Sequence, residues 1–544
     1  MSSHHIVIAL AAGAAVCASI PGLAHLQEKH AHAGPTERLG AVHFPTSCAP
    51  AVQKEFDRGV ALLHSFWFSA AIKSFEAVLA RDPDCVMAHW GIAMSWWSNP
   101  FAGFRSPQAL KAGLAAIDAA KARGAGTARE KAYIQAVDRL FRDAATTDQR
   151  TRTLAYEQAM AALSSAYADD VEARIFYALA LGQTALRSDK TYANQLKAAA
   201  ILEDEFRRQP EHPGLAHYII HSFDVPPLAP RALDAARRYA TIAPDAAHAL
   251  HMPSHTFTRV GLWEESIEAN RASAAAARKD AAAAEELHAL DYQTYAYLQT
   301  AQDAAARRTV ELAPSLAGKI EGGGAGNAAP PPAGYYALAA IPARYALERE
   351  AWSEAAALTP RPSAYAWADA VTHFARALGA ARSGNPAAAR ADVERLAALR
   401  DSLQQAKDPE WTTQVEVQRR GAAAWVALAE QRQAEALTLM REAADMEDAT
   451  EKAPVTPGPI KPARELLAEM LLQIGRPKEA LAEFEAALKK EPNRFRTTYG
   501  AARAADAAGD RQQAAAHYAS LLRICARADP SARKELLAAR KRAG

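Results

Sequence analysis

A spacing of about 34 residues recurs along this sequence and restricts the chain to a fold built from repeated units. In the C-terminal part the spacing separates matching residues in three pairs: Gly475 and Gly509, Ala480 and Ala514, Phe484 and Tyr518. Near the N-terminus, the set Gly59, Ala71, Phe75 and Pro83 has the same internal spacing as the set Ala468, Ala480, Phe484 and Pro492. A constant period of this length is the signature of a repeat array, in which each unit buries its apolar face against its neighbours.

The composition favours helices as the repeated elements. Half of the 544 residues are hydrophobic, alanine dominates, and β-branched residues are sparse. The spaced small, aromatic and proline residues resemble the tetratricopeptide repeat, clearly at both ends of the chain and in a more degenerate form between them. This resemblance implies an all-α, tetratricopeptide-like helical-repeat solenoid, in which antiparallel helix pairs stack and the first helix of each pair lines a concave face.

The sequence predicts five successive parts. They are a signal peptide over 1–24, an N-terminal extension over 25–50, a first array over 51–320, a linker or loop over 321–334, and a second array over 335–544. The apolar run from Ile6 to Ile20, followed by small residues up to Ala24, is typical of a secretory signal, although His4 and His5 stand where Lys or Arg is usual. No later segment has the apolar length of a transmembrane helix. We therefore expect a periplasmic or secreted protein without a membrane span.

Cysteine usage gives one structural expectation. Removal of residues 1–24 leaves Cys48, Cys85 and Cys525. Because disulfides persist in exported proteins, we expect a Cys48–Cys85 bond that fastens the N-terminal segment to the first helix pair, with two buried free thiols as the alternative. Cys525 has no evident partner.

Two segments interrupt the helical pattern. Residues 321–334 are too rich in Gly and Pro for a helix, which predicts a linker or flexible loop. Residues 450–462 contain four prolines and should form an extended connection. That connection is either a flap over a groove or a plain loop between repeats.

The histidines carry the strongest functional signal. The sequences HYIIH (His217, His221) and HMPSH (His251, His255) each place two histidines four residues apart, on one side of a helix. The two pairs are offset by the repeat period itself, which predicts that successive helices present them to one concave surface. Extending the register one unit gives the predicted metal ligands, which are His217, His221, His248, His251, His255, His288 and Asp291. His64, at the end of the first helix of the N-terminal unit, could face the same groove, but it is expected to lie several units away along the array.

A transition metal is the predicted cofactor. Neighbouring helices are about 9 Å apart, so paired imidazoles can converge on one or two ions. Imidazole suits borderline metals, and copper binds such sites more tightly than zinc. The spacing also resembles the HxxxH pairs of the coupled dicopper proteins, tyrosinases and haemocyanins, which implies copper oxidase or oxygenase chemistry. Asp224, Asp245 and Tyr218, like Asp291, could orient ligands or relay protons.

Two classes of function follow from these features. The first is a metal-dependent enzyme, either a copper oxidoreductase or a zinc-dependent hydrolase, although the chain has no HExxH zinc-protease motif. The second is a non-enzymatic scaffold whose concave groove holds a small molecule, a peptide or a protein partner; its histidines would then solvate the groove. The net charge of +2 gives no reason to expect nucleic acid as a partner.

Overall fold

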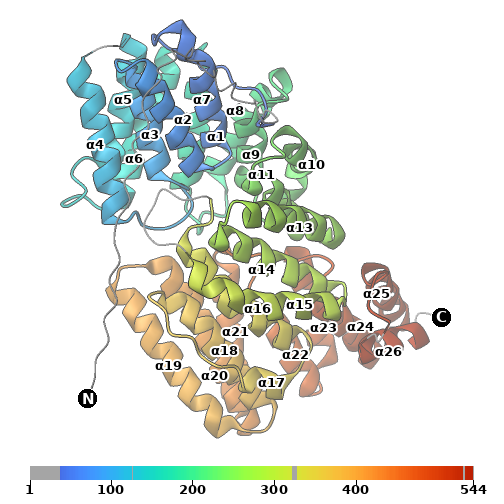
Figure 1. Ribbon diagram of the computed structural model, residues 1–544. Helices are drawn as coiled ribbons and strands as arrows, with labels where there is room; N and C mark the ends of the chain where they lie inside the picture. The colour runs from blue at the N-terminus through green and yellow to red at the C-terminus, as the bar shows by residue number, and fades with distance from the viewer. Residues whose placement is uncertain (1–36, 125, 321–327, 531–532, 543–544) are drawn as a thin grey trace, which may run out of the picture. The chain divides into compact units, whose positions relative to one another are not determined.

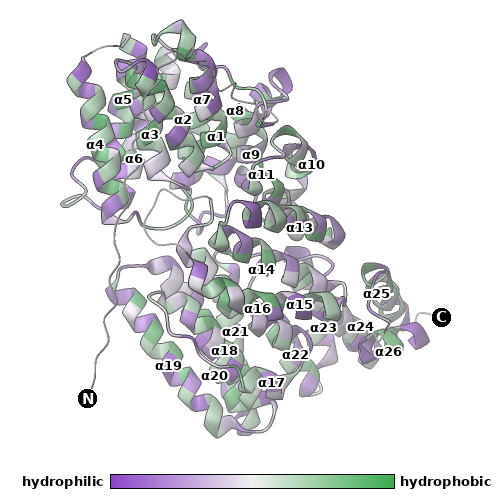
Figure 2. Ribbon diagram, viewed as in Figure 1, coloured by the Kyte–Doolittle hydropathy of each residue, from purple (hydrophilic) through white to green (hydrophobic). Residues whose placement is uncertain are grey.

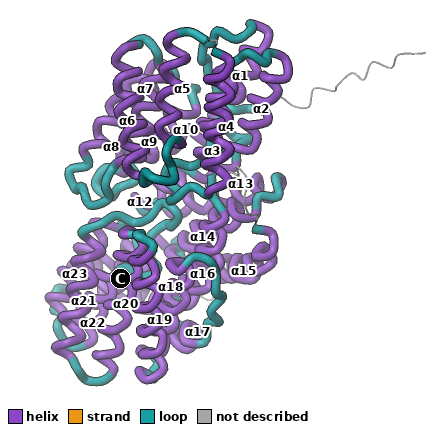
Figure 3. Tube along the Cα trace, turned by 90° about the vertical axis from the view of Figure 1, so that its left-hand side faces the viewer, coloured by secondary structure: helices purple, strands orange, loops and turns teal. Residues whose placement is uncertain are grey.

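A computed structural model describes residues 37–124, 126–320, 328–530 and 533–542. The chain divides into residues 1–37 and a compact unit from Arg38 to Gly544, and only the second is considered below. Within the described residues every regular element is a helix (Figures 1 and 3). The predicted signal peptide and most of the predicted N-terminal extension lie outside the described residues.

The first part of the unit contains the helices that precede the histidine-rich region. They are η1 (Pro50–Val52), α1 (Gln53–His64), α2 (Phe68–Arg81), α3 (Val86–Trp97), α4 (Pro107–Arg123), α5 (Ala128–Phe141), α6 (Gln149–Ala166), α7 (Val171–Thr184) and α8 (Ala193–Arg208).

The histidine-rich region and its continuation form the middle of the unit. Its helices are α9 (Pro213–Ser222), η2 (Ala229–Ala232), α10 (Leu233–Ile242), α11 (Ala247–His251), α12 (Pro253–Arg259), α13 (Trp263–Lys279), α14 (Ala283–Gln299), α15 (Asp303–Leu312) and η3 (Ala313–Lys319).

The last part continues with further helix pairs. They are α16 (Pro331–Glu348), α17 (Trp352–Ala356), α18 (Ala366–Arg382), α19 (Pro386–Gln405), α20 (Pro409–Ala429), α21 (Gln433–Asp448), α22 (Ala463–Gln473), α23 (Pro477–Lys490), α24 (Phe495–Ala507), α25 (Arg511–Ile524) and α26 (Lys534–Arg542).

The helices stack as a solenoid requires. Each packs on the next along the chain, and alternate helices also touch, as in α1 with α3 and α3 with α5, and in the series α16, α18, α20, α22 and α24. Contacts between alternate helices arise when the first members of successive pairs lie side by side. The prediction of an all-α, tetratricopeptide-like helical-repeat solenoid is therefore confirmed.

The repeat period has a direct steric explanation. A Cβ added at Gly59 of α1 would lie 2.7 Å from the ring of Phe75, and one added at Gly91 of α3 would lie 2.4 Å from the same ring. Near the C-terminus, a Cβ at Gly500 of α24 would come 2.3 Å from the Phe484 ring of α23. An aromatic ring of the second helix thus fits only against a glycine of a neighbouring first helix. Along their length, the helices carry both hydrophobic and hydrophilic residues (Figure 2).

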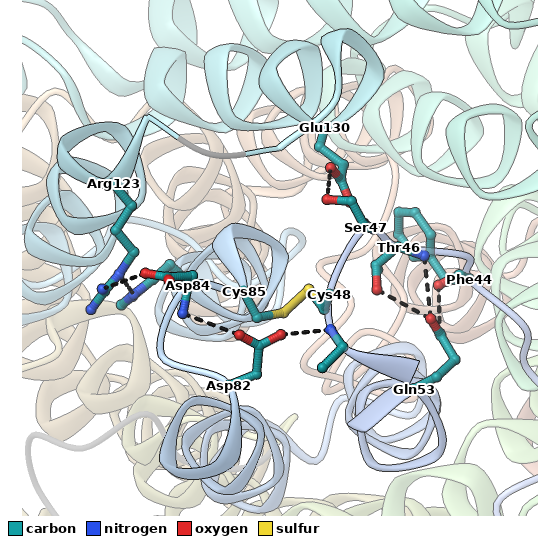
Figure 4. Close-up of a disulfide and its surroundings, with 12 residues drawn as sticks. Phe44, Thr46, Ser47, Cys48, Gln53, Asp82, Asp84, Cys85, Arg123 and Glu130 are labelled. Atoms are coloured by element: carbon teal, nitrogen blue, oxygen red, sulfur yellow. Dashed lines mark hydrogen bonds and ion pairs between the residues drawn. A yellow bond between two sulfur atoms is a disulfide. The ribbon is translucent and has the colours of Figure 1, made fainter. Parts of the chain in front are cut away.

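The N-terminal segment is held against the array by the predicted disulfide. Cys48 and Cys85 are bonded, and Cys85 is the residue immediately before α3 (Figure 4). Beside the bond, the Asp82 carboxylate accepts from the Ala49 backbone N–H at 2.7 Å. The expectation of a disulfide is confirmed, and Cys525 is a buried free thiol.

The two interruptions behave differently from each other. Residues 321–327 of the predicted linker lie outside the described residues, whereas residues 331–334 form the first turn of α16. The prediction that this stretch is non-helical is wrong at its end, because proline is well accommodated in a first helical turn. Residues 450–462 contain no helix, as expected, and they lie over the histidine-rich region. Among the described helices, none combines the length and the apolar character needed to cross a membrane.

Candidate metal centre

Six of the seven predicted ligands form two adjoining groups of three imidazoles. The first trio is His217 and His221 of α9 with His248 of α11; the second trio is His251 of α11, His255 of α12 and His288 of α14. Within each trio the candidate ligand nitrogens all lie within 4.8 Å of one another. The trios adjoin, with ring centres 6.1 Å apart for His221 and His255 and 5.9 Å apart for His248 and His251.

The chain places these rings by the predicted helical spacing, with one local variation. His217 and His221 lie one turn apart on α9, as the spacing predicts. His251 and His255 straddle the boundary between α11 and α12 at Met252, because Pro253 has no N–H to continue the helical ladder. Met252 nevertheless keeps right-handed helical backbone angles, so the two rings still face each other across one turn.

The histidines are enclosed, which differs from the open groove expected from the sequence. His217, His251 and His255 are at most 2% exposed. The ring of Phe101 stacks on His221 with centres 4.1 Å apart, and the ring centre of Phe66 lies 4.4 Å from that of His217. Aromatic side chains thus cover the first trio.

The second trio is covered by the segment of residues 450–462, which we call the lid. Lys452 Nζ lies 3.1 Å from Asp224 Oδ2, and the Val455 backbone accepts a hydrogen bond from the His288 ring. Arg344 of α16 also holds the lid, with Nη2 2.7 Å from Thr456 Oγ1. Of the two possibilities left open by the sequence, the structure has the flap.

Hydrogen bonds fix the tautomers of two rings of the second trio, those of His251 and His255. The Nδ1 atom of His255 lies 2.9 Å from Asp224 Oδ2, a carboxylate oxygen that can only accept. The Nδ1 atom of His251 lies 2.7 Å from Asn270 Oδ1, and the amide is oriented by its Nδ2, which donates to the Ser266 carbonyl at 2.7 Å. Both rings therefore carry their proton on Nδ1. Their Nε2 lone pairs then face each other at 3.1 Å, an arrangement that repels unless a cation lies between them.

In the first trio, hydrogen bonding orients one of the three rings in the same way. His217 Nδ1 lies 2.6 Å from the carbonyl oxygen of His64, so it donates and leaves the Nε2 lone pair free. That Nε2 lies 3.1 Å from His248 Nε2. His221 Nε2 is buried and has no hydrogen-bond partner. His217 thus presents the Nε2 lone pair towards His248, and His221 Nε2 forms no hydrogen bond that would compete with an ion.

Burial keeps five of the six imidazoles neutral near pH 7. Burial, reinforced by neighbouring histidines, holds the pKa values of His217, His221, His251 and His288 well below the ordinary value. Burial also lowers the pKa of His255 to about 4, although Asp224 opposes the shift. Because His251 and His255 are neutral near pH 7 and carry their proton on Nδ1, no proton lies between their Nε2 atoms. Neutral imidazole is also the form that binds transition metals.

The seventh predicted ligand, Asp291, lies beside the second trio in a different role. It is fully buried on α14, with Oδ1 2.9 Å from Arg344 Nε, while Oδ2 has no hydrogen-bond partner. Burial raises its pKa, and Arg344 opposes that rise. Asp291 thus fixes Arg344, which in turn holds the lid.

A third cluster, formed by His64, Glu172 and His212, provides an informative contrast. Glu172 accepts from the two rings, with His64 Nε2 2.9 Å from one oxygen and His212 Nε2 2.9 Å from the other. Although burial favours the neutral acid, the two histidines hold the pKa of Glu172 below its usual value. Here each ring points one nitrogen at a carboxylate oxygen rather than at another ring nitrogen, while His212 Nδ1 is buried without a hydrogen-bond partner.

His64 corrects one expectation from the sequence. It lies beside the histidine-rich region rather than several units away, because α1 packs directly on α9. A Cβ at Gly214 would lie 2.5 Å from His64 Nδ1, so the glycine allows this approach. His64 therefore supports the first trio through its carbonyl group. The Tyr218 hydroxyl oxygen lies 3.0 Å from His64 Nδ1, and the exposed Asp245 accepts a hydrogen bond from the Arg38 backbone N–H at 2.6 Å.

Three supporting residues were not identified from the sequence. Tyr292 follows His288 by four residues on α14, so helical spacing alone could have placed it beside the second trio. Asn270 and Lys452 carry no such signal, because their positions depend on how α13 and the lid pack on α11 and α12.

Comparisons with known proteins reveal likeness only at the level of solved structures. No protein-family model and no curated protein matches this sequence. The chain is similar to the human IFIT1 dimer with m7Gppp-AAAA, at 11% identity and a TM-score of 0.39 over 81% of this chain and 90% of the other. It is also similar to yeast Tom70, at 12% identity and a TM-score of 0.26 over 90% and 87%, and to the P58(IPK) TPR domain, at 15% and 0.20 over 68% and 98%. At these sequence identities and TM-scores, the likeness gives no indication of function.

Proposed function

We propose that this protein is a metal-dependent oxidoreductase with one transition-metal ion in each histidine trio. The observation that carries the proposal is the pair of Nε2 lone pairs of His251 and His255, facing each other at 3.1 Å in a buried site. Two ligand nitrogens on a tetrahedral ion at about 2.0–2.1 Å lie roughly 3.3 Å apart, so the observed separation fits a shared ion.

The donor set favours copper over zinc. All six ligands are imidazoles, which suit both metals, and copper is bound more tightly by a given set of nitrogen ligands. Three protein ligands leave a coordination position for a substrate, as in catalytic rather than structural metal sites. Copper, when bound, supplies one-electron redox chemistry. A zinc-dependent hydrolase is the second candidate, since three histidines also serve catalytic zinc.

The chain's own residues orient the ligands and keep water out. Asp224, Asn270 and the His64 carbonyl hold the Nδ1 protons of His255, His251 and His217, so each lone pair points inwards. Such outer partners fix ring orientation and raise ligand basicity. The lid and the aromatic rings exclude bulk solvent, so we propose a small molecule as substrate, reaching the centre when the lid moves.

We also propose that the protein is exported from the cytoplasm. A bonded Cys48–Cys85 pair supports an oxidising compartment, and with the predicted signal sequence it favours a periplasmic or secreted location. Fractionation of cells that produce the full chain tests this. Protein found only in the cytoplasm with both thiols reduced would contradict it.

Elemental analysis of untagged, exported protein tests the metal centre. We expect two equivalents of copper per chain. Changing His251 and His255 to Ala should remove one equivalent, changing His217 and His221 to Ala should remove the other, and changing His43, an exposed histidine outside both trios, should remove none. Circular dichroism shows whether each variant is folded.

The outcomes separate the candidate functions. Two copper ions with dioxygen consumption in the presence of a reductant support the oxidoreductase, whereas zinc with hydrolysis supports the second candidate. If the wild-type protein binds no metal, even after reconstitution, both the oxidoreductase and the hydrolase are excluded. Metal-independent capture of a defined peptide or protein by that sample would instead support the scaffold.

A further inference from the structure

A small pocket adjoins the aromatic rings that cover the first trio. Its volume is about 20 Å³, and residues of α1, α2, α3, α6, α7 and α9 line it together with the turns that follow α1 and α3. Ser98, Pro100 and Gln183, which form one part of the lining, are half-buried. Phe66 and Tyr218, which form another part, are 2% exposed. The pocket therefore extends from close to the surface into the interior of the first array.

The ring of Phe66 borders both the pocket and the first trio. Its centre lies 4.4 Å from that of His217, 5.5 Å from that of His248 and 6.0 Å from that of His221. The ring of Tyr218, a second lining residue, has its centre 5.1 Å from that of His217. A molecule that passes the Phe66 ring from the pocket therefore reaches the imidazoles of the first trio.

The buried part of the pocket is poorly suited to water. Three of its buried lining side chains carry an N–H or O–H group, and two of these groups are engaged. The Tyr218 hydroxyl oxygen lies 3.0 Å from His64 Nδ1, and the Tyr156 hydroxyl oxygen lies 3.9 Å from Met94 Sδ. The third group, Trp97 Nε1, has no hydrogen-bond partner among the described residues. A buried water forms about two to four hydrogen bonds, which one free donor does not supply, so the lining favours an apolar molecule.

Two lining residues have backbone angles that residues other than glycine seldom adopt. The φ angle is 54° at Phe66 and 61° at Ser98, where ψ is −158°. Such conformations are strained, persist only where the surrounding structure enforces them, and are concentrated at functional sites. Phe66 lies where the pocket meets the trio, and Ser98 lies in the half-buried part of the lining. Both strained positions therefore belong to the same pocket, one at each part.

We propose that this pocket admits dioxygen to the ion of the first trio, past the ring of Phe66. The inference rests on the proposed oxidoreductase and extends it by naming the oxidant and the side from which it enters. A single water needs roughly 10–15 Å³, so a pocket of about 20 Å³ accommodates one molecule of about two heavy atoms. Dioxygen has this size, is apolar, and needs no hydrogen-bond partner in the lining.

The two sides of the centre then suit different molecules. The lid side carries charged groups, among them Lys452, Asp224 and Arg344, which suit a polar substrate. The pocket is lined mainly by apolar and aromatic side chains, and its volume is too small for an organic substrate. Because an apolar lining disfavours ions and polar molecules, the oxidant and the substrate reach the centre from separate sides.

Crystals of the full chain under xenon pressure test the pocket without any reaction. Xenon is apolar and occupies apolar cavities, so we expect one anomalous xenon peak beside Phe66. The peak should be lost in Leu179→Phe, which places a larger side chain in the lining, and retained in Leu196→Phe, the same change at a position that is 38% exposed. In Phe66→Gly, where glycine adopts the positive φ without strain, xenon should also be found against His217. This variant tests the barrier even if Leu179→Phe does not fold.

Reoxidation tests the delivery of dioxygen to the first ion. The reduced, copper-loaded protein is mixed with dioxygen or with ferricyanide, and the Cu²⁺ signal is followed by electron paramagnetic resonance. Dioxygen should reoxidise Leu179→Phe several-fold more slowly than the wild type, and Leu196→Phe at the wild-type rate. Ferricyanide is a large anion that does not enter the pocket, so it should reoxidise all three proteins at the same rate.

The contrary outcomes are distinct. Ordered water in place of xenon in the wild-type pocket would overturn the pocket assignment and leave the histidine centre standing. Xenon binding with equal rates of reoxidation by dioxygen in folded Leu179→Phe and the wild type would overturn the delivery of dioxygen by this route. Failure of the wild-type chain to bind a metal would overturn the proposed function, whereas the xenon peak would still decide whether the pocket takes an apolar molecule.

Discussion

Acid should destabilise the metal-free protein in a way that can be traced to His255. Its pKa is lowered to about 4 in the folded chain by burial, against about 6.5 for an unfolded histidine. Between these values the unfolded state binds the additional proton, so the stability contributed by this group falls as the pH falls. The shift predicts a loss of about 2 to 3 kcal/mol between pH 7 and pH 4.5.

Other groups titrate in the same range, so the effect must be isolated by a variant. Burial raises the pKa of Glu447 to about 7, and this group stabilises the protein as the pH falls, which is the opposite sign. In His255→Gln the contribution of His255 disappears while that of Glu447 remains. The difference in unfolding free energy between the metal-free wild type and His255→Gln should therefore shrink by about 2 to 3 kcal/mol from pH 7 to pH 4.5.

Urea unfolding of both proteins, followed by circular dichroism at several pH values in the presence of a chelator, measures this difference. Parallel stability profiles for the two proteins would refute the reasoning, because they would mean that His255 titrates equally in the folded and unfolded states.

Three further predictions concern the groups that support the centre. Asp224→Asn should lower the affinity of the second trio for its ion by about 10–100-fold, measured in competition with a chromophoric chelator, because His255 loses the carboxylate that orients it. An unchanged affinity would contradict this orienting role of Asp224. Gly214→Ala should push a Cβ into the ring of His64 and lower metal occupancy of the first trio more than of the second, which site-resolved spectroscopy can measure; equal losses at both trios would argue against it. Replacing Cys48 and Cys85 by Ala should lower the unfolding free energy by about 4 kcal/mol in the loop-entropy account, measured by denaturant titration, since the bond closes a loop with a sequence separation of 37; a change under about 1 kcal/mol would contradict that account.

The sequence was sufficient to predict the repeated helices and most of the candidate ligands. The repeat period reflects a steric fit between glycine and phenylalanine, as at Gly500 and Phe484, so it identifies helix pairs without tertiary information. The HxxxH spacing placed His217 and His221 on one side of α9 because helical geometry is local. The predictions of the helix pairs and of the histidine pairs both depended only on contacts within one repeat or between neighbouring repeats.

The enclosure of the site could not be predicted in the same way. Lys452 and Thr456 are distant from the histidines in sequence and come close to them only through the packing of the lid on α14 and α16. His64 was misplaced because the stacking of α1 on α9 is not encoded in the repeat period. Non-local packing of this kind decides burial, and burial decides the protonation of the imidazoles.

The most direct test of a two-ion histidine centre is anomalous diffraction from crystals of the exported protein, recorded on both sides of the copper and zinc absorption edges. The account predicts two anomalous peaks, one among His217, His221 and His248 and one among His251, His255 and His288, both responding at the copper edge. Crystals of metal-loaded protein with no peak in either trio would contradict it.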